Sequence, residues 1–218
     1  AKVDLLVALA PIAYVYHERS PAYLAFAELE FAELFHFFGV REFLPSGSVL
    51  NKISPGLCNL LPEGCNAAIF LFCGTTRHIN ATRLPVYLSE TPAGTSVKNM
   101  EHWSQQARRQ SFAMFDYGSP RNNRAKYNQS EPPAYNLSRI AVKTALFTGG
   151  RDILSDPADV RQLLSELPAS SLVYHHHTES YAHLDFAWGK DANVIVYADV
   201  IKQLRMHSGA PSEEVVAV

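Results

Sequence analysis

Two side chains suited to proton transfer each follow an apolar run in the C-terminal third of the sequence. Asp152 comes shortly after the run at residues 142–147, and His183 comes after the run at residues 172–174. If both runs are strands of one open sheet, the loops that follow them meet at the same sheet edge. A histidine can take a proton from a nucleophile, and a carboxylate can orient its ring and stabilise the resulting cation. We therefore predict that Asp152 and His183 form an acid–base pair.

The chain order of this pair matches one class of serine hydrolase, in which serine comes first, aspartate second and histidine third. The nucleophile of that class lies in a Gly-x-Ser-x-Gly turn between a strand and a helix. No such sequence occurs here, and Ser48, Ser119 and Ser130 neither follow a strand-like run nor open a helix. The nucleophile is therefore missing from these 218 residues.

Other acidic and imidazole side chains near the pair have simpler explanations. Asp156 precedes Pro157 and is expected to be a helix N-cap. Asp185, beside the histidine loop, is expected to be structural, as is His102 on a predicted helix.

The triplet His175, His176 and His177 raises the question of a metal site. On a strand only His175 and His177 share a face, and no third ligand is evident. We expect neutral strand and surface histidines, and no metal.

Most elements that must position these side chains can be predicted from hydrophobic runs and breakers. Residues 3–9 are nearly all apolar and are stopped by Pro11, as expected of a fully buried parallel strand with neighbours on both sides. A strand is also expected at 142–147, with Gly149 and Gly150 allowing a tight turn that exposes Asp152. A third strand is expected at 172–174.

Helices are predicted where capping residues precede apolar residues at helical spacing. One is expected from Ser20-Pro21 to Gly39, one from Val97 to about Gln110, one after Asp156-Pro157, and one over residues 192–206. Their inward side chains are expected to be Phe26, Leu29, Leu34, Phe37 and Phe38, then Val160, Leu163, Leu164 and Leu167, then Val196, Val200 and Leu204. Residues 41–83 are expected to be irregular, 116–133 to form a long surface excursion and 208–218 a frayed tail.

The composition is that of an ordinary folded protein with one core, or one core and a small cap. Hydrophobic residues make up 47% and charged residues 18%, and the net charge is −2, which gives no electrostatic case for nucleic acid. The nine histidines add positive charge below about pH 6.5, which would suit an acidic compartment. No run approaches the ~20 apolar residues of a transmembrane segment, and no signal peptide is visible.

Several collinear segments carry a resemblance that covers nearly the whole chain. They are LAPIA (9–13), YLS (87–89), PAGTSV (92–97), NMEHW (99–103), DYGSP (116–120), YNQS (127–130), PP (132–133), GGRD (149–152) with DP (156–157), and YAHLDF (181–186). In these segments the sequence resembles the acid lipase family, which includes the animal gastric and lysosomal lipases. Members are longer, and the resemblance begins part-way through their fold.

The resemblance implies an α/β class, namely the C-terminal part of an α/β-hydrolase fold with an inserted, mostly helical cap or lid. On this basis residues 1–12 are a core sheet strand and residues 13–134 the cap. Residues 135–218 are the hydrolase core with the catalytic loops of Asp152 and His183. The Phe-rich segment after Ser20 is then a lid over an acyl-binding groove, whereas a core helix is the general alternative.

The implied function is hydrolysis of neutral lipid esters through an acyl-enzyme, at a lipid interface and without a cofactor. The serine would come from an N-terminal lipase half. The alternative is a non-catalytic, lipase-like binding or structural subunit of a larger assembly. A peptidase of the same fold is more distant, because it would not explain the cap motifs.

The cysteines and three sequons favour the secretory pathway, with a secreted or lysosomal protein. Cys58, Cys65 and Cys73 could all be buried thiols, but the resemblance implies a Cys58–Cys65 disulfide with Cys73 free. The predicted glycosylation sites are Asn80, Asn128 and Asn136.

Overall fold

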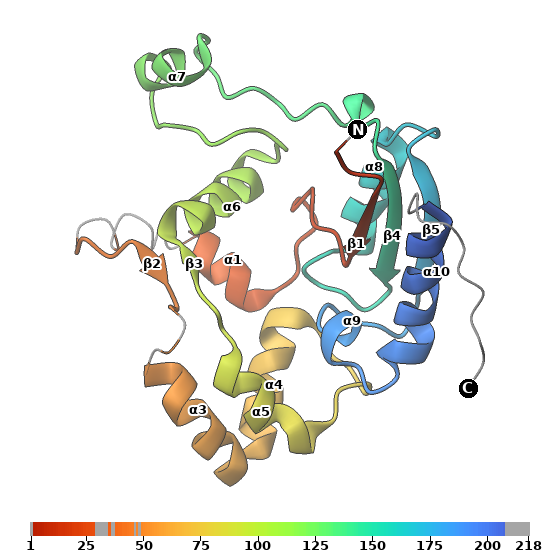
Figure 1. Ribbon diagram of the computed structural model, residues 1–218. Helices are drawn as coiled ribbons and strands as arrows, with labels where there is room; N and C mark the ends of the chain where they lie inside the picture. The colour runs from red at the N-terminus through yellow and green to blue at the C-terminus, as the bar shows by residue number, and fades with distance from the viewer. Residues whose placement is uncertain (1, 29–34, 36–37, 46, 48, 208–218) are drawn as a thin grey trace.

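A three-stranded parallel sheet forms the core of the computed structural model, which describes residues 2–28, 35, 38–45, 47 and 49–207. The strands are β1 (Leu5–Leu9), β4 (Lys143–Gly149) and β5 (Leu172–Thr178), in the order β1-β4-β5 (Figure 1). The three predicted strands are confirmed, and β5 runs on through the histidine triplet. The central strand β4 is buried from its second residue onward, because it has neighbours on both sides.

Alternate residues of β4 feed two separate hydrophobic clusters, one on each face of the sheet. Ala145 and Phe147 pack with Phe186 and Val196 on the face covered by α10 (Ala198–His207). Leu146 packs with side chains of α8 (Pro157–Glu166) on the opposite face. The sheet is therefore a middle layer between helices, the arrangement expected when a parallel sheet is buried on both faces.

The strand β1 departs from the prediction of a fully buried strand. It pairs with β4 only, and Leu6 and Leu9 remain 47% and 38% exposed. Among the described residues no strand lies on its other side. This edge is the main apolar surface that the sheet leaves open.

The described helices between β1 and β4 lie outside the sheet layers (Figure 1). These elements are α1 (Pro21–Glu28), α3 (Val49–Leu60), α4 (Pro62–Cys73), a 3-10 turn (Ala81–Arg83), α5 (Leu84–Glu90), α6 (Val97–Arg109) and α7 (Pro120–Tyr127), with a two-stranded sheet of β2 (Glu42–Phe43) and β3 (Thr95–Ser96). A second 3-10 turn (Leu137–Arg139) precedes β4.

The prediction of irregular structure at 41–83 is wrong, since α3 and α4 occupy much of it. Pro55 lies inside α3, and Pro62 occupies the first turn of α4, where its missing N–H costs nothing. The surface excursion at 116–133 likewise contains α7. Its signals were readable: Ser119 caps the first turn and Asn128 ends the helix in the left-handed conformation.

The capped helix starts are confirmed. The hydroxyl of Ser20 accepts the N–H of Tyr23 at 3.3 Å, and the hydroxyl of Ser96 accepts the N–H of Asn99 at 3.0 Å. Asp156 caps α8 through the N–H of Ala158 at 2.8 Å. The predicted inward positions Leu29, Leu34 and Phe37, the side chain of Phe26 and the tail at 208–218 lie outside the described residues.

The closing helix differs from its prediction in two ways. It begins with a π-helical turn (Asn193–Tyr197) that continues directly into α10. Val196 is fully buried, but Leu204 is 46% exposed rather than inward. Phe38 is also exposed, at 68%. None of the helices described is long and apolar enough to cross a membrane.

Candidate active site

Asp152 and His183 lie together beyond the carboxyl ends of β4 and β5. Nδ1 of His183 is 3.0 Å from Oδ2 of Asp152. The other carboxylate oxygen of Asp152 accepts the N–H groups of Leu154 and Ser155 at 2.9 and 2.8 Å. Asp152 is fully buried, not exposed as the sequence predicted, and these contacts compensate for the loss of water around its charge.

The two glycines before Asp152 are needed because two backbone segments approach each other closely. A Cβ atom on Gly149 would collide with the carbonyl oxygen of Tyr181, and one on Gly150 would lie 2.6 Å from that of Glu179. Neither glycine has a positive φ angle, so close approach, rather than a left-handed turn, explains them. This approach brings the two loops of the pair together.

His183 has the geometry of a general base. Because Nδ1 faces a carboxylate it carries the hydrogen, which leaves the lone pair on Nε2. Nε2 forms no hydrogen bond to the residues that the structure describes, and the side chain is 23% exposed. A nucleophile at this position could therefore transfer its proton to Nε2.

Both loops are fastened to distant parts of the chain. The hydroxyl of Ser155 donates to the carbonyl oxygen of Pro11 at 2.5 Å, just after β1. The backbone N–H of His183 donates to the carbonyl oxygen of Cys73 at 3.3 Å, at the end of α4. The pair is thus held against both the sheet and the helical segment.

The other acidic and histidine residues near the proposed site have partners of their own. Asp156 is the α8 N-cap and pairs with Arg19 at 2.6 Å. Asp185 is fully buried and accepts the hydroxyl of Thr76 and the N–H of Ala182 at 2.6 and 2.7 Å. Nε2 of His102 lies 2.8 Å from the carbonyl oxygen of Ala113. These contacts agree with the predicted structural roles.

Sequence reasoning missed a buried acid near the pair. Glu18 is 7% exposed. One carboxyl oxygen accepts the N–H of Ser20 at 2.8 Å, and the other is buried with no hydrogen-bond partner in the part of the chain that the structure describes. Burial, and next the charges of Asp152, Asp159 and Asp156, raise the pKa of Glu18 to about 8 against the opposing Ser20 hydrogen bond. No local sequence signal marked this residue.

Cys73, the free cysteine that the resemblance implied, is partly buried near the pair. It is free of disulfides, and burial, followed by the charges of Asp152 and Glu18, raises the pKa of its thiol to about 12. A thiol in such surroundings stays protonated and is a poor nucleophile. Cys73 therefore does not replace the missing serine.

The histidine triplet divides between the two faces of β5, as the strand period requires. His175 and His177 both contact the hydroxyl of Thr148, at 2.8 and 3.0 Å, whereas His176 lies on the other face, 3.3 Å from Asp199. Within the described part of the chain no group of three or more His, Cys, Asp or Glu side chains is arranged to hold a metal ion.

Known lipases match this chain over nearly all of its length. Human gastric triacylglycerol lipase is 40% identical over 209 residues, which cover 93% of this chain and 51% of the lipase. Human lysosomal acid lipase/cholesteryl ester hydrolase is 39% identical over 209 residues (94% of the chain, 52% of the enzyme), and mouse lipase member M is 39% identical over 215 residues (96% and 50%). The chain belongs to the acid lipase family. No protein-family model matches it.

The match also shows which part of an acid lipase this chain corresponds to. The chain spans about half the length of the curated relatives and corresponds to the C-terminal part of an acid lipase. Its parallel sheet and helices agree with the C-terminal part of the lipase α/β-hydrolase fold.

Two further features expected of an acid lipase can be located in the structure. Cys58 and Cys65 form a disulfide, with their Cα atoms 5.5 Å apart, that links α3 to α4. Asn80, Asn128 and Asn136 are all exposed, so each could accept a glycan without unfolding. Glycosylation at these asparagines stays a prediction.

Proposed function

We propose that this chain is the C-terminal portion of a serine-triad lipase that hydrolyses neutral lipid esters through an acyl-enzyme. The observation that carries the proposal is the hydrogen bond between Asp152 and His183, which leaves Nε2 of His183 free. The serine would be supplied by an N-terminal half related to the rest of the acid lipases. The names of two relatives, triacylglycerol lipase and cholesteryl ester hydrolase, support a neutral ester as substrate.

In the acylation step, the serine oxygen attacks the ester carbonyl carbon while its proton moves to Nε2 of His183. The tetrahedral intermediate then collapses, and Nε2 returns the proton to the departing alcohol. Water repeats the sequence on the acyl-enzyme and releases the fatty acid. Asp152 stays ionised throughout and stabilises the imidazolium, while oxyanion donors would come from the N-terminal half.

Residues 13–134 are proposed to form the cap of this lipase, and residues 1–12 and 135–218 the hydrolase core. The described part of this cap carries many large apolar side chains that are about half exposed or more. They are Ile53, Leu57 and Leu60 on α3, Leu61 between α3 and α4, Leu71 and Phe72 on α4, and Val86 on α5. An exposed apolar surface of this kind supports contact with a lipid interface.

The same proposal includes a route through the secretory pathway, to a secreted or lysosomal location. The Cys58–Cys65 disulfide supports it, because disulfides persist in oxidising compartments. The exposed sequon asparagines Asn80, Asn128 and Asn136 support it as well.

A non-catalytic lipase-like subunit is the second candidate. The feature that favours it is the lack of Gly-x-Ser-x-Gly in the 218 residues. In that case Asp152 and His183 would be remnants of a site that no longer turns over ester.

A fluorophosphonate probe distinguishes the two candidates. Native material that contains this chain is labelled, and every labelled peptide is identified by mass spectrometry. We expect a labelled serine on a polypeptide from the N-terminal half. His183→Ala should abolish labelling, and Asp152→Asn should slow it by about 10⁴-fold, the usual cost of a lost triad carboxylate.

The matched control is His207→Ala. This histidine ends α10, and among the described residues it bonds only to Lys143, the first residue of β4, whereas Asp152 follows the other end of that strand. It should leave labelling unchanged. Folded material that does not label would reject the lipase proposal and leave the subunit as the better explanation.

A further inference from the structure

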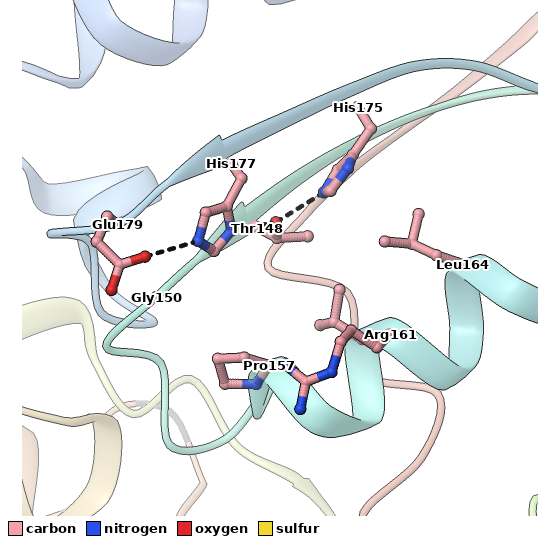
Figure 2. A pocket seen from close by; sticks show the side chains of 9 residues that line it. Thr148, Gly150, Pro157, Arg161, Leu164, His175, His177 and Glu179 are labelled. Carbon is pink, nitrogen blue, oxygen red and sulfur yellow. Dashed lines mark hydrogen bonds and ion pairs between the residues drawn. The ribbon is translucent and has the colours of Figure 1, made fainter.

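A cavity of about 400 Å³ lies between α8 and the carboxyl ends of β4 and β5 (Figure 2). Its volume falls within the range of small-molecule sites, about 300–1,000 Å³. Neither Asp152 nor His183 lines it. It opens on the α8 face of the sheet and is separate from the proposed triad.

One wall of the cavity is a chain of hydrogen-bonding side chains. The hydroxyl of Thr148, which is 1% exposed, contacts Nε2 of His175 at 2.8 Å and Nδ1 of His177 at 3.0 Å. Nε2 of His177 lies 3.1 Å from the carboxylate of Glu179. Figure 2 shows Thr148 between the two rings.

Protonation changes the balance of donors and acceptors at this wall. When both rings are neutral, the Thr148 hydroxyl donates to one ring nitrogen and accepts from the other. When both rings are charged, both nitrogens donate to the hydroxyl oxygen. The hydroxyl hydrogen of Thr148 then needs a new acceptor, and so does the Nδ1–H of His175, which has no partner among the described residues.

The charges around the cavity also change with pH. Arg161 lies on the α8 wall, and Glu179, with its side chain 89% exposed, lies on the opposite rim. These two charges offset each other at neutral pH, whereas charged histidines make the lining positive in acid. His176 and its partner Asp199 lie on the other face of β5.

His175 becomes protonated at a lower pH than an ordinary histidine. Burial, followed by the neighbouring His177 and His176, lowers the pKa of His175. The lining therefore reaches its full positive charge only in acidic solution.

The α8 wall, opposite the histidines, is apolar apart from Arg161. Pro157, Val160 and Leu164 form its apolar part. A ligand that matches both walls has an acceptor-only anionic group and an apolar body. Glu179 at the rim would repel a dianion more strongly than a monoanion.

We propose that this cavity binds a carboxylate with an apolar tail, such as a free fatty acid, and binds it more tightly in acid. The carboxylate accepts hydrogen bonds from Arg161, Thr148 and the histidine wall, and the tail packs against Val160 and Leu164. The proposal does not depend on ester hydrolysis, because the cavity shares no side chain with the proposed triad.

Nuclear magnetic resonance of the protein labelled at its histidine rings tests the site with octanoate, below its micelle concentration. Spectra are taken at about pH 5.5 and about pH 7.5, on either side of the usual histidine pKa. We expect octanoate to shift the signals of His175 and His177 but not of His176. We expect binding to be about 10-fold tighter at the lower pH, because each unit of ring charge adds attraction.

Two controls separate specific binding from general charge or hydrophobic effects. Arg161→Gln should weaken octanoate binding by about 10-fold, as expected for loss of a charge-assisted hydrogen bond. Arg205→Gln, which changes an exposed arginine of α10, should not. Octanol tests the need for the charge, and inorganic phosphate tests the need for the tail.

Several outcomes would overturn the proposal: no shift of the His175 and His177 signals, equal binding of octanol or of phosphate, or equal effects of the two arginine substitutions. None of these readouts involves hydrolysis, so they are independent of the fluorophosphonate result.

Discussion

Carboxyl groups crowd the buried region beside the proposed triad, and Glu18 has the fewest groups to stabilise its charge. Its neighbours His17 and Arg19 point toward α8, where they pair with Asp159 and Asp156 at 2.7 and 2.6 Å. Among the described residues, the Glu18 carboxyl group accepts a hydrogen bond only from the N–H of Ser20. A buried acid in such surroundings keeps its proton, which links folding to pH.

The pKa of Glu18 is about 8 in the folded protein, compared with an ordinary value of 4.5. A raised acid pKa means that the folded state binds a proton that the unfolded state has already lost between these two values. The contribution of Glu18 to stability is therefore fully present below about pH 4.5, falls as the pH rises, and is lost above about pH 8. Glu18→Gln removes this dependence.

We expect Glu18→Gln to stabilise the protein relative to wild type, and to do so by about 3 kcal/mol more at pH 8 than at pH 4.5. This value follows from 1.36 kcal/mol of unfolding free energy per unit of pKa shift, reduced to allow for relaxation around the charge. Urea unfolding at a series of pH values measures it. The control is Glu90→Gln, an exposed glutamate at the end of α5. If the wild-type and Glu18→Gln curves run parallel, Glu18 ionises normally and the argument fails.

At the level of single residues, the sequence predicted the Asp152–His183 pair, because the ends of neighbouring strands bring such side chains together. It could not predict Glu18, whose burial depends on the packing of segments far apart in the chain. It also assigned Gly149 and Gly150 to a turn, although close backbone contact with Tyr181 and Glu179 is what requires them. Contacts between loops are a tertiary property, and no local pattern encodes them.

Among the elements, α3 and α4 depend on a covalent link more than on local sequence preference. Pro55 lies within α3, and α4 has no buried residue among those described. The disulfide between Cys58 and Cys65 joins the two helices across seven positions. We infer that this bond, rather than helix propensity, holds the α3–α4 hairpin.

We expect replacement of Cys58 and Cys65 by serine to destabilise the protein by about 2–3 kcal/mol, the loop-closure contribution expected of a short bridge. Thermal unfolding without reductant measures the change, and reductant should lower the melting temperature of the wild type but not of the double variant. Cys73→Ser is the control for serine substitution and should keep the reductant response. A double variant that melts like the wild type would contradict the inferred role of the disulfide.

Elements that local sequence signals specify could be predicted, whereas elements that depend on other interactions could not. The core strands and α6 and α8 were readable, because apolar runs and the caps Ser96 and Asp156 are local signals. The hairpin of α3 and α4 was not, since its Pro and Gly breakers outweighed the helical periodicity and a disulfide compensates for them. The π-helical turn before α10 also had no signal in the sequence.

For the molecule as a whole, the open edge of the sheet is the feature with the largest consequences. Strand β1 hydrogen-bonds only to β4, so the outward backbone groups of β1 have no strand partner among the described residues. Val3, Leu6 and Leu9 are 50%, 47% and 38% exposed there. Unpaired backbone groups beside apolar side chains form a template for another strand.

We therefore expect the isolated 218-residue chain to self-associate at concentrations on the order of micromolar, the range in which exposed strand edges aggregate. Leu6→Lys should increase the monomer fraction, because a charge on an edge strand opposes pairing. Sedimentation velocity measures both. The matched control is Leu204→Lys, which changes a leucine of almost equal exposure, 46% against 47%, on the helix α10 rather than on the edge strand.

The same substitution connects this edge to the proposed function. If an N-terminal lipase half pairs with β1, Leu6→Lys should also weaken association with that half and reduce fluorophosphonate labelling, whereas Leu204→Lys should change neither. A chain that stays monomeric, or that responds equally to both lysines, would mean that β1 is not a pairing surface. If the chain self-associates but does not bind the N-terminal half, β1 is still a pairing surface, but the result counts against the proposed lipase assembly.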